Sequence, residues 1–231
     1  MSSTYLELCR QVRQEAAISG EGPSSVTGQK GQLAVVVKWV KQAWIDVQKE
    51  RPDWNFLWAQ LSFDTVAATD EYSPQYLGVA PKRIEDSVRI YNKIAGSDDS
   101  SFLERVEWVD FKEDYLVGKQ ESGRPRYFTT KPNGSVQFYP SPDDIYVIEM
   151  DIYRAPQVLV DGTDIPLIPY EFEDAIVQRA LVLWGAYTDA PEVYRSAKAI
   201  YETLITQMNE SQLPELRLGT ATLSAGRRNK F

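Results

Sequence analysis

The stretch IYVIEMDIYR, residues 145–154, decides the fold class of this chain. Its side chains alternate in character, and successive side chains of a β-strand point to opposite faces. Tyr146, Ile148, Met150 and Ile152 therefore share one apolar face, whereas Glu149 belongs to a mixed face with its odd-numbered neighbours. We expect a strand that packs its apolar face into a core and turns the other face to solvent or to an interface.

The residues before this strand predict a mostly antiparallel β module. Lys131-Pro132-Asn133-Gly134 lies between two aromatic, alternating runs, 124–130 and 135–139, and Asn-Gly between such runs is a strong hairpin signal. Further strands are expected in 61–67, 83–91 and 102–106, and 108–117 is expected to be a short helix or an ordered loop. The module should span about residues 61–160.

Helical periodicity replaces this alternation on the N-terminal side. Residues 4–18 carry apolar side chains at spacings of three and four, and Thr4 with Glu7 fits a capping box. A second helix is expected over 32–50, because Pro52 prevents its continuation. Its apolar side omits Gln48 and the lysines. That apolar side comprises Leu33, Val36, Val37, Val40, Trp44 and Val47.

Two more helices are expected after the β module. Pro169 fits the first turn of one helix, and Asp189-Ala190-Pro191 starts another that runs to about residue 211. The expected apolar side of the first comprises Phe172, Ile176, Val177, Ala180, Leu183 and Trp184. That of the second comprises Val193, Tyr194, Ala197, Ile200, Leu204 and Met208.

The order of these elements predicts an α+β protein. The N- and C-terminal helix pairs should form one helical bundle with the β module inserted between them, because short loops favour antiparallel neighbours. We divide the chain into N-terminal helices of the bundle (1–60), the inserted β module (61–160), C-terminal helices of the bundle (161–211) and an extended basic C-terminal arm (212–231).

The arm differs in charge and composition from the rest of the chain. Its four basic residues and one acidic residue give it a charge of +3, so the remainder carries −11 of the total of −8. Pro214 discourages continuation of the last helix, and Gly219 and Gly226 accompany few large side chains. We expect this arm to be poorly ordered in a free monomer and extended along a partner. Its candidate partner-binding residues are Leu216, Arg217, Leu218, Leu223, Arg227, Arg228, Lys230 and Phe231.

Composition argues against most enzyme chemistry. The chain has no histidine, the commonest general base and metal ligand, and its one cysteine, Cys9, is expected to be a small core residue. We predict no catalytic, cofactor-binding or metal-binding residues. Carboxylate chemistry remains an alternative, with acids such as Asp98-Asp99, Asp143-Asp144, Glu171 with Glu173, and Glu149 with Asp151 as candidates. A single cysteine cannot form a disulfide within the chain, which favours folding inside a cell. No signal peptide or membrane helix is expected.

Several local phrases, in their order along residues 4–211, resemble head–tail connector (adaptor) proteins of tailed bacteriophages. They are Tyr5-Leu6-Glu7-Leu8, the Gly- and Ser-rich loop before the Trp39–Trp44 helix, Asp53-Trp54-Asn55-Phe56-Leu57, Gly123-Arg124-Pro125-Arg126-Tyr127-Phe128, Phe138-Tyr139-Pro140 and Leu167-Ile168-Pro169. None of these phrases is a catalytic signature.

The resemblance implies a structural virion protein at the head–tail interface, made in the host cytoplasm. It implies a homo-oligomeric ring of about twelve copies beneath the portal protein, with tail or nozzle proteins as further partners and DNA passing through the lumen without specific binding. The arm would most readily extend along the portal. The alternatives are another tail-side component, such as a nozzle or tail-completion protein, and an acidic carboxylate-based hydrolase.

Overall fold

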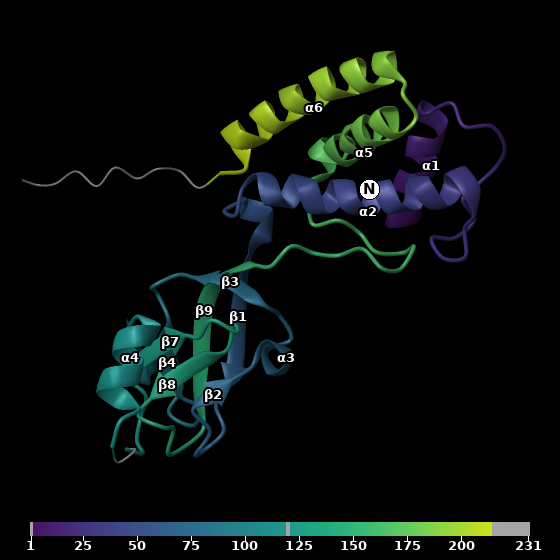
Figure 1. The fold of residues 1–231 in the computed structure, drawn as a ribbon. Coiled ribbons are helices and arrows are strands. Elements are labelled where there is room, and N and C mark those ends of the chain that lie inside the picture. Colours follow the sequence, from purple (N-terminus) through teal and green to yellow (C-terminus); the bar gives the residue numbers. More distant parts are fainter. Residues whose placement is uncertain (1, 119–120, 214–231) are drawn as a thin grey trace, which may run out of the picture.

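The computed structural model describes residues 2–118 and 121–213, which form a helical bundle and a β module joined by two adjacent connections (Figure 1). Four helices make the bundle: α1 (Tyr5–Glu15), α2 (Gly31–Glu50), α5 (Asp174–Tyr187) and α6 (Pro191–Ser211). The β module lies between α2 and α5 in the chain. The expected α+β class, with the terminal helix pairs in one bundle, is confirmed.

α1 begins with the expected capping box and ends earlier than expected. The Glu7 backbone N–H donates to Thr4 Oγ1 at 3.3 Å, and the Thr4 N–H donates to Glu7 Oε2 at 2.7 Å. The helix stops at Glu15 instead of residue 18, because Ala17 adopts a left-handed backbone with φ 53°. Such a residue ends a helix by turning the chain away from its axis.

α5 is the central helix of the bundle and packs against α1, α2 and α6. It begins at Asp174, later than expected, because Pro169 precedes a separate 3₁₀ turn, Tyr170–Phe172. At Gly185 it approaches the start of α6 so closely that a Cβ atom would lie 2.9 Å from the Tyr194 backbone nitrogen. The buried residues of α5 are Ala175, Ile176, Val177, Gln178, Ala180, Leu181, Val182, Trp184 and Gly185.

α6 covers α5 with one face and turns the other face to solvent. Ala197, Tyr201 and Met208 are buried. The sequence-based placement of Ile200 on the apolar side is wrong, because this side chain is 43% exposed and Tyr201 fills the core position beside it.

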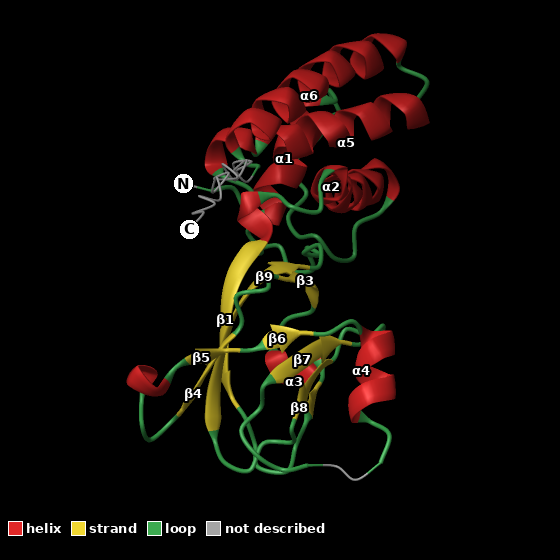
Figure 2. Ribbon diagram, turned by 90° about the vertical axis from the view of Figure 1, so that its left-hand side faces the viewer, coloured by secondary structure: helices red, strands yellow, loops and turns green. Residues whose placement is uncertain are grey.

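The β module consists of two sheets (Figure 2). The five-stranded sheet contains β1 (Trp58–Asp64), β9 (Tyr146–Arg154), β4 (Arg89–Asn92) and β5 (Ser101–Phe102) in that order, and β3 (Pro81–Ile84) also pairs with β9. The four-stranded sheet has the order β2 (Glu71–Tyr72), β8 (Val136–Tyr139), β7 (Tyr127–Thr130) and β6 (Glu104–Arg105). Two short helices accompany them, α3 (Pro74–Leu77) and α4 (Trp108–Tyr115), and α4 packs on β7.

β9 is the middle of the five-stranded sheet, with the faces that its sequence predicts. Tyr146, Ile148, Met150 and Ile152 are at most 6% exposed and meet apolar residues of the four-stranded sheet in the module core. The expected hairpin is also present as β7 and β8, where the Lys131 N–H donates to the Ser135 carbonyl at 2.9 Å.

The other strands differ from the sequence-based boundaries. The strand expected at 61–67 is β1, which starts at Trp58, and the run 83–91 contains parts of two strands, β3 and β4. The strand expected at 102–106 is divided between the two sheets. Leu103 is buried at the crossing, and the Leu103 N–H donates to the Val88 carbonyl while the Glu104 N–H donates to the Arg126 carbonyl.

The segment 155–169 ties the β module to the bundle. Gln48 of α2 is only 1% exposed, so its placement off the buried side of that helix is wrong. Its Nε2 donates to the Gln157 carbonyl at 2.9 Å, and its Oε1 accepts from the Gln157 N–H at 2.7 Å. The Gln157 side chain in turn accepts from Trp44 Nε1 at 3.1 Å and from the Leu167 N–H at 3.1 Å.

Candidate partner-binding surfaces

The candidate binding residues of the arm, from Leu216 to Phe231, lie outside the described residues. The structure fixes the place from which the arm departs. The Asn55 N–H donates to the Gln212 carbonyl at 2.8 Å, and Leu213 packs against the bundle core. Because Asn55 lies in the 3₁₀ turn immediately before β1, the arm leaves the body at the junction of the bundle and the β module.

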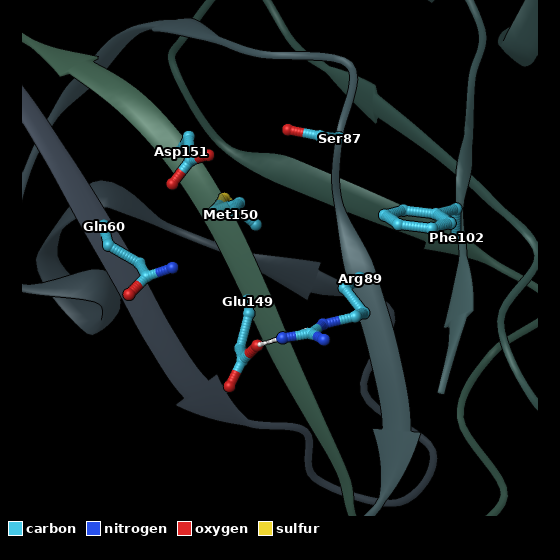
Figure 3. A pocket seen from close by; sticks show the side chains of 7 residues that line it. All are labelled: Gln60, Ser87, Arg89, Phe102, Glu149, Met150 and Asp151. Carbon is cyan, nitrogen blue, oxygen red and sulfur yellow. Dashed lines mark hydrogen bonds and ion pairs between the residues drawn. The ribbon is translucent and has the colours of Figure 1, made fainter. Parts of the chain in front are cut away.

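A second surface is the outer face of the five-stranded sheet, the face turned away from the four-stranded sheet (Figure 2). Cross-strand partners share a face, so the register places Ser62, Glu149, Arg89 and Phe102 in one row across β1, β9, β4 and β5. Phe102 is 71% exposed at one end of this row. Figure 3 shows Glu149, Arg89 and Phe102 of this row among the side chains that line a hollow between β1 and β5.

Ionic and hydrogen-bonding contacts hold the centre of this face. Arg89 Nη2 and Nε lie 2.8 Å and 3.2 Å from Glu149 Oε2, and the Tyr91 hydroxyl donates to Glu149 Oε1 at 3.2 Å (Figure 3 draws the ion pair). Desolvation and the neighbouring Glu149 charge raise the pKa of Tyr91. Both carboxylate oxygens of Glu149 are thus engaged, which suits a fixed contact surface.

This hollow is small for a substrate site. Its volume is about 170 Å³, below the roughly 300 Å³ at which ligand pockets usually begin. A larger hollow of about 520 Å³ lies beside α6. There Tyr201 donates to Glu50 Oε1 at 3.0 Å, and nearby Arg179 pairs with Asp46 at 2.7 Å. These four side chains therefore form two pairs, in which each polar group bonds to its partner.

In each pair of acids considered for hydrolysis, at least one carboxylate has a structural partner. Asp143 Oδ1 accepts from the Tyr146 hydroxyl at 2.7 Å, and burial together with this bond raises the pKa of Tyr146 to about 12. Arg124 Nη1 donates to Asp99 Oδ2 at 2.7 Å and lowers the pKa of that carboxyl. Glu173 is 5% exposed and accepts the Ser3 N–H at 2.9 Å. Sequence reasoning missed this last contact, which spans most of the chain.

The tip of the β module, opposite the bundle, combines exposed apolar and acidic side chains. Three loops meet there, since the Ala68 N–H donates to the Pro142 carbonyl and the Lys93 N–H donates to the Ile145 carbonyl. Their exposed apolar residues are Val66, Ile94 and Ile145. The acids at or beside these loops are Asp64, Asp98, Asp99, Asp143 and Asp144. This tip offers a third contact surface.

The described part of the chain has neither a cluster of metal ligands nor a membrane-spanning helix. No three His, Cys, Asp or Glu side chains within residues 2–118 and 121–213 are grouped so that they could hold a metal ion. None of the helices in that part of the chain has the length and apolar character to cross a membrane. Cys9 is fully buried, and burial raises the pKa of its thiol to about 12, as expected for a core residue.

Comparison with known proteins identifies one family. The family model described as SU10 adaptor protein matches residues 3–228, nearly the whole chain. A comparison with curated proteins gives no match. The family match confirms the resemblance to phage head–tail adaptors that the sequence phrases indicate.

Proposed function

Since the chain belongs to the SU10 adaptor protein family and is thereby a structural adaptor of a bacteriophage virion, we propose that it joins the portal protein of the head to the tail. About twelve copies form a ring beneath the portal, and nozzle or other tail proteins attach to the opposite side. The family match over residues 3–228 is the observation that carries this proposal. The protein has a structural role and catalyses no reaction.

The geometry of the described residues supports such a ring. A head-to-tail ring needs two different, complementary surfaces on every subunit, and this subunit presents distinct faces on its two parts. The polar outer face of α6 belongs to the bundle, whereas the outer sheet face and the acidic tip belong to the β module. Neither part repeats the surface of the other.

Charge supports a passage for DNA through the ring. The chain outside the arm carries −11, and like charges keep a DNA backbone from adhering to a wall. We therefore place a net acidic surface along the lumen, through which DNA moves without specific binding. A particle structure in which lysine and arginine line the lumen would contradict this placement.

The basic arm is the proposed attachment to the portal. Its test is a truncation after Leu213, because Gln212 and Leu213 still contact the bundle. The shortened protein should keep its helical content and melting temperature but bind purified portal rings more weakly. Circular dichroism reports the helical content and the melting temperature, and co-sedimentation with portal rings reports the binding.

A charge-matched control separates the arm from net charge. Replacing Arg227, Arg228 and Lys230 with alanine should weaken portal binding. The control replaces Lys49, Lys82 and Lys112, three exposed bases of the body, and should leave binding unchanged. Equal portal binding by the full-length protein, the truncated protein and the arm triple variant would show that the arm plays no part in attachment.

A further inference from the structure

β1 lies at an edge of the five-stranded sheet, and its backbone direction can be read from its pairing. The Thr65 N–H donates to the Tyr146 carbonyl at 2.7 Å, and the register pairs the preceding residues of β1 with β9. In an antiparallel pair, alternate residues direct their N–H and C=O groups to the partner. The odd-numbered residues of β1 thus face β9, and Trp58, Gln60, Ser62 and Asp64 direct theirs outward.

Part of this outward row is already bonded. The Trp58 N–H donates to the Asn55 carbonyl, and the Asp64 carbonyl accepts from the Tyr76 hydroxyl at 3.3 Å. Within the described residues, the N–H and C=O groups of Gln60 and Ser62 and the carbonyl of Trp58 have no hydrogen-bond partner. The side chains of Gln60 and Ser62 are exposed, so another strand can reach these groups.

The other sheet edges carry features that discourage pairing. β2, β5 and β6 have two residues each, and β3 contains Pro81, Lys82 and Arg83. Short edge strands, prolines and basic side chains are the usual protection of sheet edges. β1 has seven residues, with no proline and no basic residue. Among the described strands it is the edge best suited to accept a further strand.

We propose that residues 216–223 of a neighbouring copy add to this edge as an antiparallel strand. This inference rests on the ring proposed above. The sequence LRLGTATL at 216–223 contains no proline and is one residue longer than β1. Arg217 supplies a positive charge for the outer face, where Asp151 lies opposite Gln60 and forms no ion pair within the described chain. The basic residues from Arg227 onward stay available for the portal.

The position of Leu213 shows why the strand comes from a neighbour. The arm leaves the body beside Asn55, at the bundle end of β1. To run antiparallel to its own β1, the segment would have to start at the far end of that strand, about 23 Å away. The two residues 214 and 215 span at most about 7 Å. All strand pairs of this sheet are antiparallel, and only another copy's arm can continue that pattern.

Hydrogen exchange of the outward amides tests the proposal. In full-length rings, the amides of Gln60 and Ser62 should exchange at least about tenfold more slowly than in the protein truncated after Leu213, because pairing protects an N–H from solvent. Native mass measured on the same samples shows whether rings form. If the full-length protein forms rings but its Gln60 and Ser62 amides exchange as fast as those of the truncated protein, the strand addition alone is overturned. If the full-length protein forms no rings, the proposed assembly is overturned.

Dilution and one substitution complete the test. Protection that persists in diluted full-length monomers would overturn the inference, because it would mean pairing within one chain. Ser62→Pro removes an outward N–H that makes no ladder bond to β9, so it should abolish protection at Gln60 in the rings. In the protein truncated after Leu213 the same substitution should leave the melting temperature within a few degrees, which shows that the sheet itself is intact.

Discussion

Replacing Gln48 with methionine should weaken the whole bundle, although the two side chains have similar size. Gln48 forms two hydrogen bonds with the backbone of Gln157 and a third, at 3.1 Å, to the Trp44 carbonyl. Methionine fills the space but cannot bond, which leaves the N–H and C=O of Gln157 unpaired. A buried polar group without a partner costs about 1–3 kcal/mol.

The expected loss follows from the number of groups that are left unpaired. Gln157 is half-buried, so water partly replaces its lost contacts, and we expect the unfolding free energy to fall by about 2–4 kcal/mol. For a chain of this length, that corresponds to a melting temperature roughly 5–15 °C lower. Urea unfolding followed by tryptophan fluorescence measures the free energy, because Trp44 lies beside the substituted residue.

Gln42→Met is the matched control on the same helix. Gln42 is half-buried and donates only to Asp46, one turn away, at 2.7 Å. Its replacement should cost less than about 1 kcal/mol. If Gln48→Met costs no more than Gln42→Met, the hydrogen bonds to segment 155–169 do not stabilise the joint between bundle and module.

Three further changes test other parts of the fold. Gly185→Ala should lower the unfolding free energy by about 1–3 kcal/mol, because its Cβ meets Tyr194 backbone; Gly123→Ala, with open space around it, is the control in the same thermal melts. Thr4→Ala removes the capping box and should cost about 1 kcal/mol in urea unfolding. The folded state holds the Cys9 proton to about pH 12, whereas the unfolded thiol loses it near its ordinary pKa. Stability should therefore fall as pH rises above about 9, and less steeply in Cys9→Ala.

Local patterns in the sequence predict the elements whose stability is local. The capping box at Thr4 and the Asn133-Gly134 hairpin appear where expected, because the bonds that form them lie within a few residues. The alternation of residues 145–154 likewise identifies the apolar face of the central strand. In each case the signal and the structure it specifies occupy the same short stretch.

Distant contacts explain what the sequence could not predict. Gln48 is polar, yet it is buried because it bonds to Gln157, a residue that follows the whole β module in the sequence. The run 102–106 resembles one strand, but Leu103 anchors a crossing between two sheets. The free edge of β1 has no sequence signal of its own, since an edge is defined by the strand that is missing beside it.

The facing positions of Trp58 and Tyr153 have an evolutionary consequence. These residues are opposite one another where the chain enters and leaves the β module, so the two connections are about one strand spacing apart, near 5 Å. A gap of that size can be closed by a tight turn. Insertions, deletions or exchange of a gene segment between these two codons would therefore leave the helices in place. Among relatives of this chain, length variation should concentrate between these two residues, while the four long helices keep their lengths; an alignment with equal variation in both parts would argue against such modular descent.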